Sequence, residues 1–207
     1  MIADTHIPEL LAVLPKGIVH LFQDVDLILH AGDVTGAEVL DELKLLAPVV
    51  AVKGDHDALD LPVKTVVEIG GARIGLIHGR RPVWRELPSI LSNELFAGRR
   101  FWWGGFQRQV LRAFSQVEVI VFGHFHRPYL AWHDGVLLFC PGAVYHLTPE
   151  HAQAQLSEDP PFIRRVFLRR WLRRAAKNPT VVTGPPPLGL LTVVEGTIQA
   201  EVLPIPG

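Results

Sequence analysis

The sequence predicts an α/β fold built on one mixed β-sheet or on two packed sheets. Short apolar runs alternate with helix-like stretches through the first two-thirds of the 207-residue chain, which is typical of α/β proteins. Three pairs of apolar runs are also separated by two-residue turn signals, at 70–71, 134–135 and 195–196. Such turns join antiparallel strands, which argues against the all-parallel sheet of doubly wound proteins.

The individual elements follow from the apolar runs in chain order. Strands are expected at 25–30, 48–52, 63–69, 73–78, 118–122, 128–132, 136–140, 190–194 and 197–202. A helix is expected at 37–46, between the first two of these runs. The stretch 84–116 is helical in pattern but is broken at 98–105 by an aromatic, basic loop, and 144–188 ends in a Gly-Pro-Pro-Pro breaker. Both are interpreted as excursions from a single domain that covers 1–207.

Composition and charge exclude several classes of protein. With 48% hydrophobic residues and a formal net charge of −1, the chain is too apolar and too weakly charged to be disordered. No run of about 18 apolar residues predicts a membrane span. The first residues do not form a secretory signal, and the single cysteine, Cys140, has no internal disulfide partner. We therefore expect a cytoplasmic protein whose metal sites, if present, use nitrogen and oxygen ligands.

Aspartate and histidine residues follow four of the predicted strands and the short apolar run at 1–3, at the point where each run ends. These residues are Asp4, His6, Asp33, Asp55, His56, His78, His124 and His126. The carboxyl ends of strands gather at one edge of an open α/β sheet, and ligands bind there. We therefore expect these side chains to surround one crevice. The remaining histidines are interpreted as ordinary polar residues: His20, His30, His133, His146 and His151.

The spacing and chemistry of this cluster indicate metal binding. In extended backbone, residues i and i+2 point to the same side, so Asp4 and His6 are expected to face one ion, as are His124 and His126. Imidazole and carboxylate without thiolate suit manganese, iron, zinc, nickel or cobalt. The candidates outnumber the three or four ligands of a single catalytic zinc. Two ions that share a carboxylate would use them all.

The ordered motifs resemble those of the calcineurin-like metallophosphoesterases. They are D-x-H at 4–6, G-D at 32–33, G-D-H-D at 54–57, H-G at 78–79 and G-H-x-H at 123–126. The compact size and a Cys-Pro-Gly after a predicted strand are similar to the small phosphodiesterase branch, which also contains the retromer scaffold subunit. The resemblance implies a four-layer fold of two packed mixed β-sheets flanked by helices. It also implies a phosphoester hydrolase with two divalent ions, manganese first, with iron, zinc or nickel as alternatives.

The resemblance further implies a role for each residue. One ion takes Asp4, His6, Asp33 and His126, and the other takes Asp33, Asp55, His78 and His124. Two cations lower the pKa of a bridging water and neutralise the phosphoryl oxygens, so Asp33, which joins them, counts as catalytic. His56 is the candidate general acid for the leaving alkoxide. Asp57 either orients His56 or caps the turn.

Two departures from the family pattern carry expectations of their own. Asp55 stands where the family usually has asparagine, and its extra negative charge predicts tighter metal retention and weaker attraction for an anionic substrate. Only residues 1–3 precede Asp4, whereas relatives have a full strand there. We expect either a very short first strand or a translation start that lies upstream.

The stretch Ile163–Lys177 holds seven basic residues and no acidic one. Apolar residues recur within it at helical spacing, which predicts an amphipathic helix. The apolar positions are Ile163, Val166, Phe167, Trp171 and Ala175. We expect this stripe to lie on the protein core, and the alternative is that the basic face binds an anionic membrane surface or nucleic acid.

Two further groups of residues leave alternatives open. The aromatic loop residues Phe101, Trp102 and Trp103 either overhang the crevice and stack on a substrate or cover a small core of their own. The arginines that follow candidate ligands either meet a phosphate or stay solvated, and they are Arg80, Arg81 and Arg127.

The sequence thus favours a metal-dependent phosphoesterase that hydrolyses a phosphodiester or a small phosphomonoester. The alternative is a non-catalytic, metal-binding scaffold for protein interactions on the same fold. Retention of every motif histidine argues for the enzyme, while Asp55 and the short first strand argue mildly for the scaffold.

Overall fold

The computed structural model describes residues 1–82, 84–88, 103–144, 147–160, 162–177 and 185–206. Its elements are α1 (Lys16–Phe22), β1 (Ile28–His30), α2 (Ala37–Lys44), β2 (Val49–Ala51), β3 (Lys64–Ile69), β4 (Ala72–Ile77), α4 (Phe106–Ala113), β5 (Val119–Phe122), β6 (Tyr129–His133), β7 (Val136–Cys140), α5 (Pro149–Ser157), α6 (Phe162–Lys177), β8 (Pro187–Val194) and β9 (Thr197–Pro204). A short helix at 84–88 lies between β4 and α4. All nine expected strands are present, with bounds that differ by a few residues. Helix α1 was not expected, because it is short, contains a glycine and has no side-chain cap.

The larger sheet is five-stranded and mixed, with the order β3-β4-β5-β7-β6. Its three central strands are parallel to one another, and each edge strand is antiparallel to its neighbour. The hairpin turns at 70–71, 134–135 and 195–196 have positive φ at both residues, as two-residue type I′ turns require. The predicted hairpins and the mixed sheet are therefore confirmed.

The first three residues of the chain connect the remaining strands into a second layer. β1 pairs with β2 in parallel, and β8 pairs with β9 in antiparallel orientation. Ile2 N donates to Leu29 O and Ala31 N donates to Ile2 O, both at 2.9 Å, while Gly189 N donates to Met1 O at 2.9 Å. The segment before Asp4 thus lies between β1 and β8 and forms one bridge to β1.

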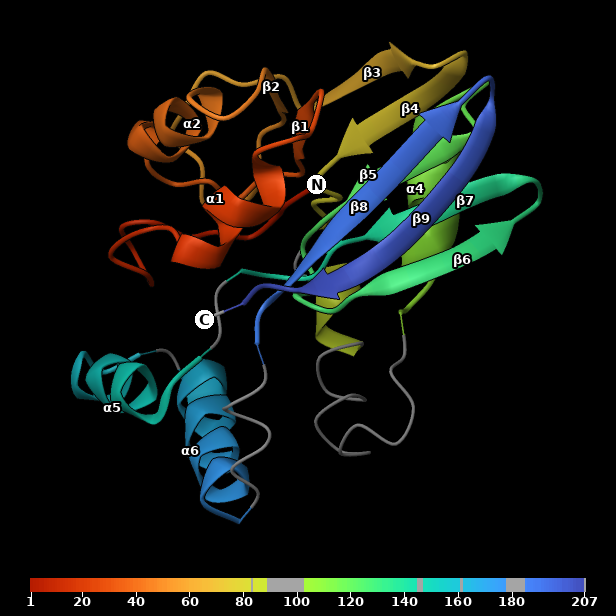
Figure 1. Cartoon of the computed structure of the whole chain (residues 1–207). Coiled ribbons are helices and arrows are strands. Elements are labelled where there is room, and N and C mark those ends of the chain that lie inside the picture. Colours follow the sequence, from red (N-terminus) through yellow and green to blue (C-terminus); the bar gives the residue numbers. More distant parts are fainter. Residues whose placement is uncertain (83, 89–102, 145–146, 161, 178–184, 207) are drawn as a thin grey trace.

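The two sheets enclose the central core, and α4 covers the outer face of the five-stranded sheet (Figure 1). Alternation along β5 decides the layers: Val119 and Val121 face the other sheet, and Ile120 and Phe122 face α4. All four residues of β5 are buried, as expected for a strand covered on both sides. Helices α1 and α2 pack on the β1–β2 side through a separate cluster. The result is the four-layer architecture that the sequence predicted.

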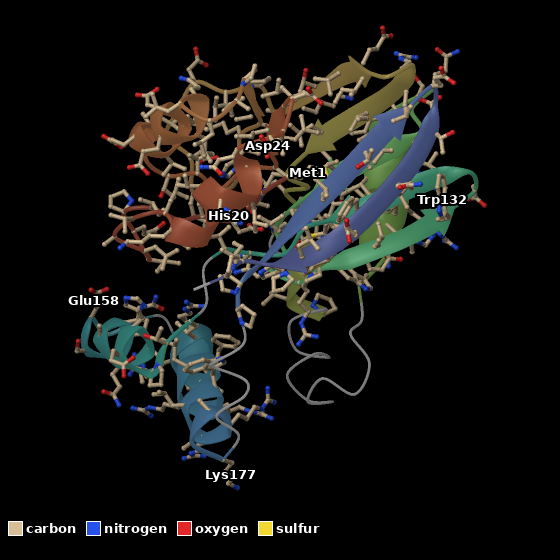
Figure 2. All side chains as sticks on the ribbon, in the orientation of Figure 1. Met1, His20, Asp24, Trp132, Glu158 and Lys177 are labelled. Carbon is tan, nitrogen blue, oxygen red and sulfur yellow. The ribbon has the colours of Figure 1, made fainter. Side chains whose placement is uncertain are left out.

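Helices α5 and α6 pack against each other and lie below the two sheets in Figure 1. Figure 2 places Glu158, just after α5, and Lys177, the last residue of α6, far from Met1 between the sheets. The amphipathic helix is confirmed, but the expected apolar stripe is partly wrong. Leu168 and Ala175 are buried, whereas Val166 is 40% exposed, so the covered face is rotated from the one predicted. In the described part of the chain, no helix combines the length and apolar character needed to cross a membrane.

Parallel pairing brings the ends of four strands to the same edge. β1 and β2 end together, since His30 pairs with Ala51, and the loops that follow carry Asp33 and Asp55. β4 and β5 also end together, and His78 and the 123–126 loop follow them directly. This shared edge is where the predicted site residues lie.

Candidate metal centre

The structure brings all seven predicted metal ligands together in two adjacent groups. The first group is Asp4, His6, Asp33 and His126, and the second is Asp55, His78 and His124. Within each group the candidate ligand atoms lie within 4.8 Å of one another. His56 lies beside the first group, with its ring centroid 5.0 Å from that of His6.

One carboxylate, that of Asp33, faces both groups. Its Oδ2 lies 3.5 Å from Nε2 of His6 in the first group and 3.4 Å from Nε2 of His78 in the second. Its Oδ1 accepts a hydrogen bond from the backbone N of His56 at 2.9 Å, which fixes the orientation of the carboxylate. A single oxygen is thereby held between two sets of nitrogen and oxygen ligands.

Five of the seven candidate ligands have left-handed backbone conformations. They are Asp4, His6, Asp33, His124 and His126, with φ between 48° and 80°. A positive φ is uncommon for residues other than glycine and costs conformational energy, and such strain gathers at functional sites. The expectation from i, i+2 spacing that His124 and His126 face one ion is wrong. His126 belongs to the first group and His124 to the second.

Hydrogen bonding fixes the tautomer of His78 and tests whether a cation fits. Nδ1 of His78 lies 2.8 Å from the backbone O of Ala31, so Nδ1 carries the proton and donates it. Nε2 of His78 lies 3.4 Å from Asp33 Oδ2 and 3.8 Å from Asp55 Oδ2. Within the described residues it is buried without a hydrogen-bond partner, so a positive charge between this nitrogen and the two carboxylates is favourable. The donor set fits a divalent metal ion.

Asp4 offers a second test of fit. It is fully buried, and within the described residues its Oδ2 has no hydrogen-bond partner. Burial raises the pKa of Asp4, but the nearby imidazoles, His126 foremost, lower it well below its usual range. A buried, ionised carboxylate with an unsatisfied oxygen is costly unless a cation binds it. Asp4 is therefore suited to metal coordination.

A carboxylate outside the predicted motifs, Glu86, contacts His124 from the side opposite Asp55. Oε1 of Glu86 lies 2.8 Å from His124 Nε2, and Asp55 Oδ2 lies 3.0 Å from His124 Nδ1. Arg81 donates to both oxygens of Glu86, from Nε at 2.7 Å and from Nη2 at 3.0 Å. The Arg81 guanidinium is also packed on Phe106 and Phe125. Arg81 is thus buried rather than solvated, and its guanidinium is paired with Glu86.

This arrangement shifts two pKa values. Burial lowers the pKa of His124, but hydrogen bonds with Asp55 and Glu86 outweigh burial and raise the pKa to about 9. Burial raises the pKa of Glu86, but hydrogen bonds with His124 and Arg81 lower it to about 2. A positive charge, either a proton on His124 or a cation at its Nδ1, balances the two carboxylates.

Asp57 links the two loops that carry Asp33 and Asp55 through hydrogen bonds with their backbone. Its Oδ2 accepts hydrogen bonds from Asp33 N at 3.0 Å and Gly54 N at 2.7 Å, and its Oδ1 accepts one from Thr35 N at 2.7 Å. Gly54 is required here because a Cβ at this position would collide with Asp33. Of the two roles considered for Asp57, the structure supports the structural one.

Glu9 is a second acidic residue that the motifs did not reveal. Its Oε2 lies 3.5 Å from Nδ1 of both His6 and His56. The His56 side chain is 53% exposed, so it faces solvent at the rim of the first group. Glu9 follows the D-x-H motif by three residues, and only this proximity in the chain hinted at its position.

The structure also places Trp103 of the aromatic loop and the two arginines Arg80 and Arg127. Trp103 packs edge-on against Phe125 and Tyr129, so it covers a small core of its own, while Phe101 and Trp102 lie outside the described residues. Arg80 Nε lies 3.1 Å from Asp55 Oδ1. Arg127 is exposed but not without an interaction partner.

His30 is an ordinary core histidine, as expected. Its Nδ1 accepts from Gly32 N at 3.2 Å, and its Nε2 lies 3.2 Å from Thr5 Oγ1. Both ring nitrogens are therefore satisfied. His146 lies outside the described residues.

Comparisons with known proteins agree with this geometry. A probable metallophosphoesterase of Methanocaldococcus jannaschii is 39% identical over 143 residues, which cover 69% of this chain and 66% of that protein, just under two thirds of its length. A probable metallophosphoesterase of Methanothermobacter thermautotrophicus is 34% identical over 149 residues, covering 69% of this chain and 74% of that protein.

Solved structures share the fold at low sequence identity. Vps29 from Entamoeba histolytica, in a structure described as complexed with Zn²⁺, is 22% identical, with a TM-score of 0.55 over 99% of this chain and 97% of that one. Vacuolar Protein Sorting 29 from Cryptosporidium parvum is 20% identical, with a TM-score of 0.58 over 98% and 94% of the two chains. The family model of the calcineurin-like phosphoesterase superfamily domain matches residues 1–157. The chain therefore belongs to the calcineurin-like phosphoesterase superfamily.

Proposed function

We propose that this protein hydrolyses a phosphodiester or a small phosphomonoester with two divalent cations bound, manganese first among them. The observation that carries the proposal is the position of Asp33 Oδ2, within 3.5 Å of His6 Nε2 and 3.4 Å of His78 Nε2. One ion would be held by Asp4, His6, Asp33 and His126, and the other by Asp33, Asp55, His78 and His124. When bound, the two cations lower the pKa of a water between them and neutralise charge on the phosphoryl oxygens.

His56 is the proposed general acid. It stands at the exposed rim of the centre rather than inside either ligand group, so its imidazole can approach the leaving oxygen of a bound ester. Glu9, 3.5 Å from His56 Nδ1, would hold the ring with Nε2 toward that oxygen. A positioned histidine that donates a proton to the leaving group contributes about 10²–10⁴ in rate.

Glu86 is the proposed positioning residue for His124. Because Glu86 accepts from Nε2, it would keep the proton on that nitrogen when a cation takes the place of the Nδ1 proton beside Asp55. Carboxylates behind a metal-bound histidine orient the ring and raise its basicity. Arg81 in turn holds both oxygens of Glu86 in place.

Asp55 adjusts the charge of the centre. Its carboxylate contacts His124, His78 and Arg80, three groups that compensate its negative charge. Burial raises the pKa of Asp55, but the hydrogen bond and charge of His124 lower it below its usual range, so the side chain is an anion at neutral pH. It would bind a cation more tightly than an asparagine amide and repel an anionic substrate more strongly.

The test is a metal analysis paired with an activity assay. The purified protein is reloaded with manganese, its metal content is measured, and hydrolysis of bis-p-nitrophenyl phosphate is followed. Two equivalents of metal with turnover support the proposal. Protein that is folded but binds no divalent cation contradicts it.

The alternative function is a non-catalytic, metal-binding scaffold for protein interactions. The observation that favours it is the likeness in fold to Vps29 across nearly the whole chain. Two bound equivalents of metal without turnover of diester or monoester substrates would favour this scaffold. The exposed position of His56, which a scaffold does not need, favours the enzyme.

A further inference from the structure

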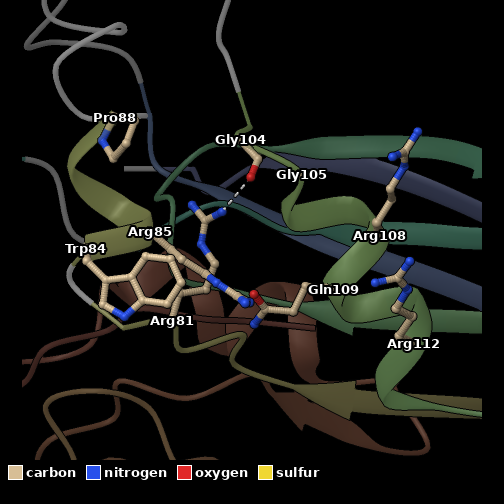
Figure 3. Close-up of a pocket in the computed structure, with 9 residues that line it drawn as sticks. All are labelled: Arg81, Trp84, Arg85, Pro88, Gly104, Gly105, Arg108, Gln109 and Arg112. Carbon is tan, nitrogen blue, oxygen red and sulfur yellow. Dashed lines mark hydrogen bonds between the residues drawn. The ribbon is translucent and has the colours of Figure 1, made fainter.

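A cavity of about 600 Å³, within the usual range for ligand sites, is lined in part by Arg81 (Figure 3). Arg81 pairs with Glu86, which contacts His124 of the candidate metal centre. The residues that line the cavity include Arg81, Trp84, Arg85, Arg108, Gln109 and Arg112. Figure 3 shows Trp84 and Arg85 on one side, and α4 with Arg108, Gln109 and Arg112 on the other. Among the described residues that line the cavity, none is an aspartate or a glutamate.

Of the four arginines that line the cavity, three have a positive charge that no described carboxylate balances. Arg81 is neutralised by Glu86 behind the cavity wall. Within the described residues, by contrast, Arg85, Arg108 and Arg112 have no carboxylate within 4.0 Å. Guanidinium groups bind phosphate oxygens through paired hydrogen bonds, and convergent like charges repel until an anion binds between them. The cavity is therefore suited to a ligand with several negative charges.

The cavity is connected to the metal centre through one carboxylate. Arg81 reaches from the cavity, where its Nη1 donates to Gly104 O at 3.1 Å, to Glu86, whose Oε1 contacts His124. Gln109 Nε2 donates to the backbone O of Arg80 at 3.2 Å, in the loop that follows His78. The cavity thus lies on the far side of the Arg81–Glu86 pair from His124.

An exposed indole adds a flat surface beside these charges. Trp84 is 67% exposed, and the Arg85 guanidinium lies 4.8 Å from its ring centroid. Bases of single-stranded nucleic acids stack on such aromatic and guanidinium planes while their phosphates bind arginine. A metabolite whose single phosphate lies at the metal centre leaves the arginines of the cavity without an anion. An oligonucleotide supplies further phosphates for these arginines and bases that can stack on the Trp84 ring.

From these observations we propose that the cavity binds the flanking nucleotides of a single-stranded nucleic acid whose scissile phosphate lies at the metal centre. The proposal rests on the proposed function for the position of the scissile phosphate, but the cavity itself can be tested by binding alone. The near-zero net charge of the chain means that the attraction is local to this surface rather than general.

The experiment measures binding of a fluorescein-labelled, ten-nucleotide phosphorothioate DNA strand to manganese-loaded protein by fluorescence anisotropy at several salt concentrations. The test variant is Arg108→Glu/Arg112→Glu. The matched control is Arg169→Glu/Arg173→Glu, which makes the same charge change at exposed positions of α6. We expect the test variant to weaken binding by about tenfold or more and to reduce the salt slope by about 1.4, since each lost phosphate contact to a single strand removes about 0.7. The control should bind within about twofold of wild type.

Three outcomes would overturn the proposal: unchanged binding by the test variant, equal loss in both variants, or competition by thymidine monophosphate as strong as that by the oligonucleotide. If thermal melting shows that the test variant does not fold, Arg108→Gln/Arg112→Gln replaces it with the same expectation and the same contrary results. Hydrolysis of bis-p-nitrophenyl phosphate by wild type is measured in parallel. If the wild type shows no turnover but its DNA binding depends on Arg108 and Arg112, the result counts against the proposed function alone. If the wild type shows turnover but its DNA binding does not depend on these arginines, the result counts against the cavity as a binding site alone.

Discussion

Glu86 contacts His124 Nε2 at 2.8 Å, on the side of the imidazole that faces away from Asp55. A carboxylate oxygen can only accept, so Glu86 keeps a proton on Nε2, and a cation bound beside Asp55 would replace only the proton on Nδ1. Nδ1 is thereby directed toward Asp55 and the second ligand group. The geometry of this group thus depends on a residue that belongs to none of the sequence motifs.

The substitution Glu86→Gln should weaken divalent metal binding at the second group by about 10–100-fold, the usual cost of losing a carboxylate behind a ligand histidine. The amide does not compensate the charge on His124, and the ring loses its fixed tautomer. Titration calorimetry with Mn²⁺ measures the change. An affinity equal to that of wild type would show that Glu86 does not orient His124.

Arg81→Gln is the control for this prediction. It removes the buried cation but leaves Glu86 beside His124, so the melting temperature should fall while manganese affinity stays within a few-fold of wild type. Glu86→Gln should lower both, since it leaves Arg81 buried without its partner, which typically costs about 3–5 kcal/mol. Equal losses of affinity in both variants would assign the effect to packing.

Asp55→Asn should lower metal affinity by about tenfold, or about 1.4 kcal/mol, and should also lower KM for an anionic diester. The first effect follows from the loss of a negative ligand. The second follows because the centre becomes more positive and Arg80 is released from its 3.1 Å contact with Asp55. Steady-state kinetics and calorimetry measure both. Asp60→Asn, at an exposed position of the same loop, is the matched control, and an Asp55→Asn variant that lowers neither quantity contradicts the assignment.

His56→Gln should lower kcat by about 10²–10³ for a diester with an alkyl leaving group and only slightly for bis-p-nitrophenyl phosphate. An alkoxide needs a proton as it leaves, whereas p-nitrophenolate is stable without one. Metal content should be unchanged, since His56 lies outside both ligand groups. The same fractional loss for both substrates would exclude proton donation as its role.

His30 should make the stability of the protein fall in mild acid. Burial lowers its pKa to about 4, so between pH 6.5 and 4 the unfolded state binds more protons than the folded state. Stability is therefore full above the unfolded pKa and decreases as the pH falls, by about 3 kcal/mol across this window. Urea unfolding at a series of pH values measures the slope. His30→Gln should be less stable at neutral pH but should show a shallower slope, while the exposed control His20→Gln should keep the wild-type slope.

The strands, the hairpins and the place of the site were predictable because local signals specify them. Apolar runs and two-residue turns reflect burial and backbone geometry directly, and the polar residues that end each strand share one edge by the rules of parallel pairing. The side-chain directions were not predictable. His124 and His126 lie in different groups, whereas Asp4 and His6, with the same spacing and the same left-handed backbone, lie in one, so spacing along the chain did not decide these directions.

Glu86 and Glu9 escaped prediction for a different reason. Each reaches the site through tertiary packing, and a single acidic residue in a helical or turn-rich stretch carries no local pattern that separates it from a surface residue. The covered face of α6 was partly misassigned on similar grounds, because its partner is α5, and an apolar stripe does not specify what it packs against.

The metal content of Asp33→Ala, measured by mass spectrometry after manganese reloading and compared with wild type, tests the central claim most directly. Asp33 presents one oxygen to both ligand groups, so its removal should reduce two equivalents per chain to fewer than one, while circular dichroism shows the fold retained. A folded Asp33→Ala protein that still holds two equivalents would contradict the shared two-ion centre.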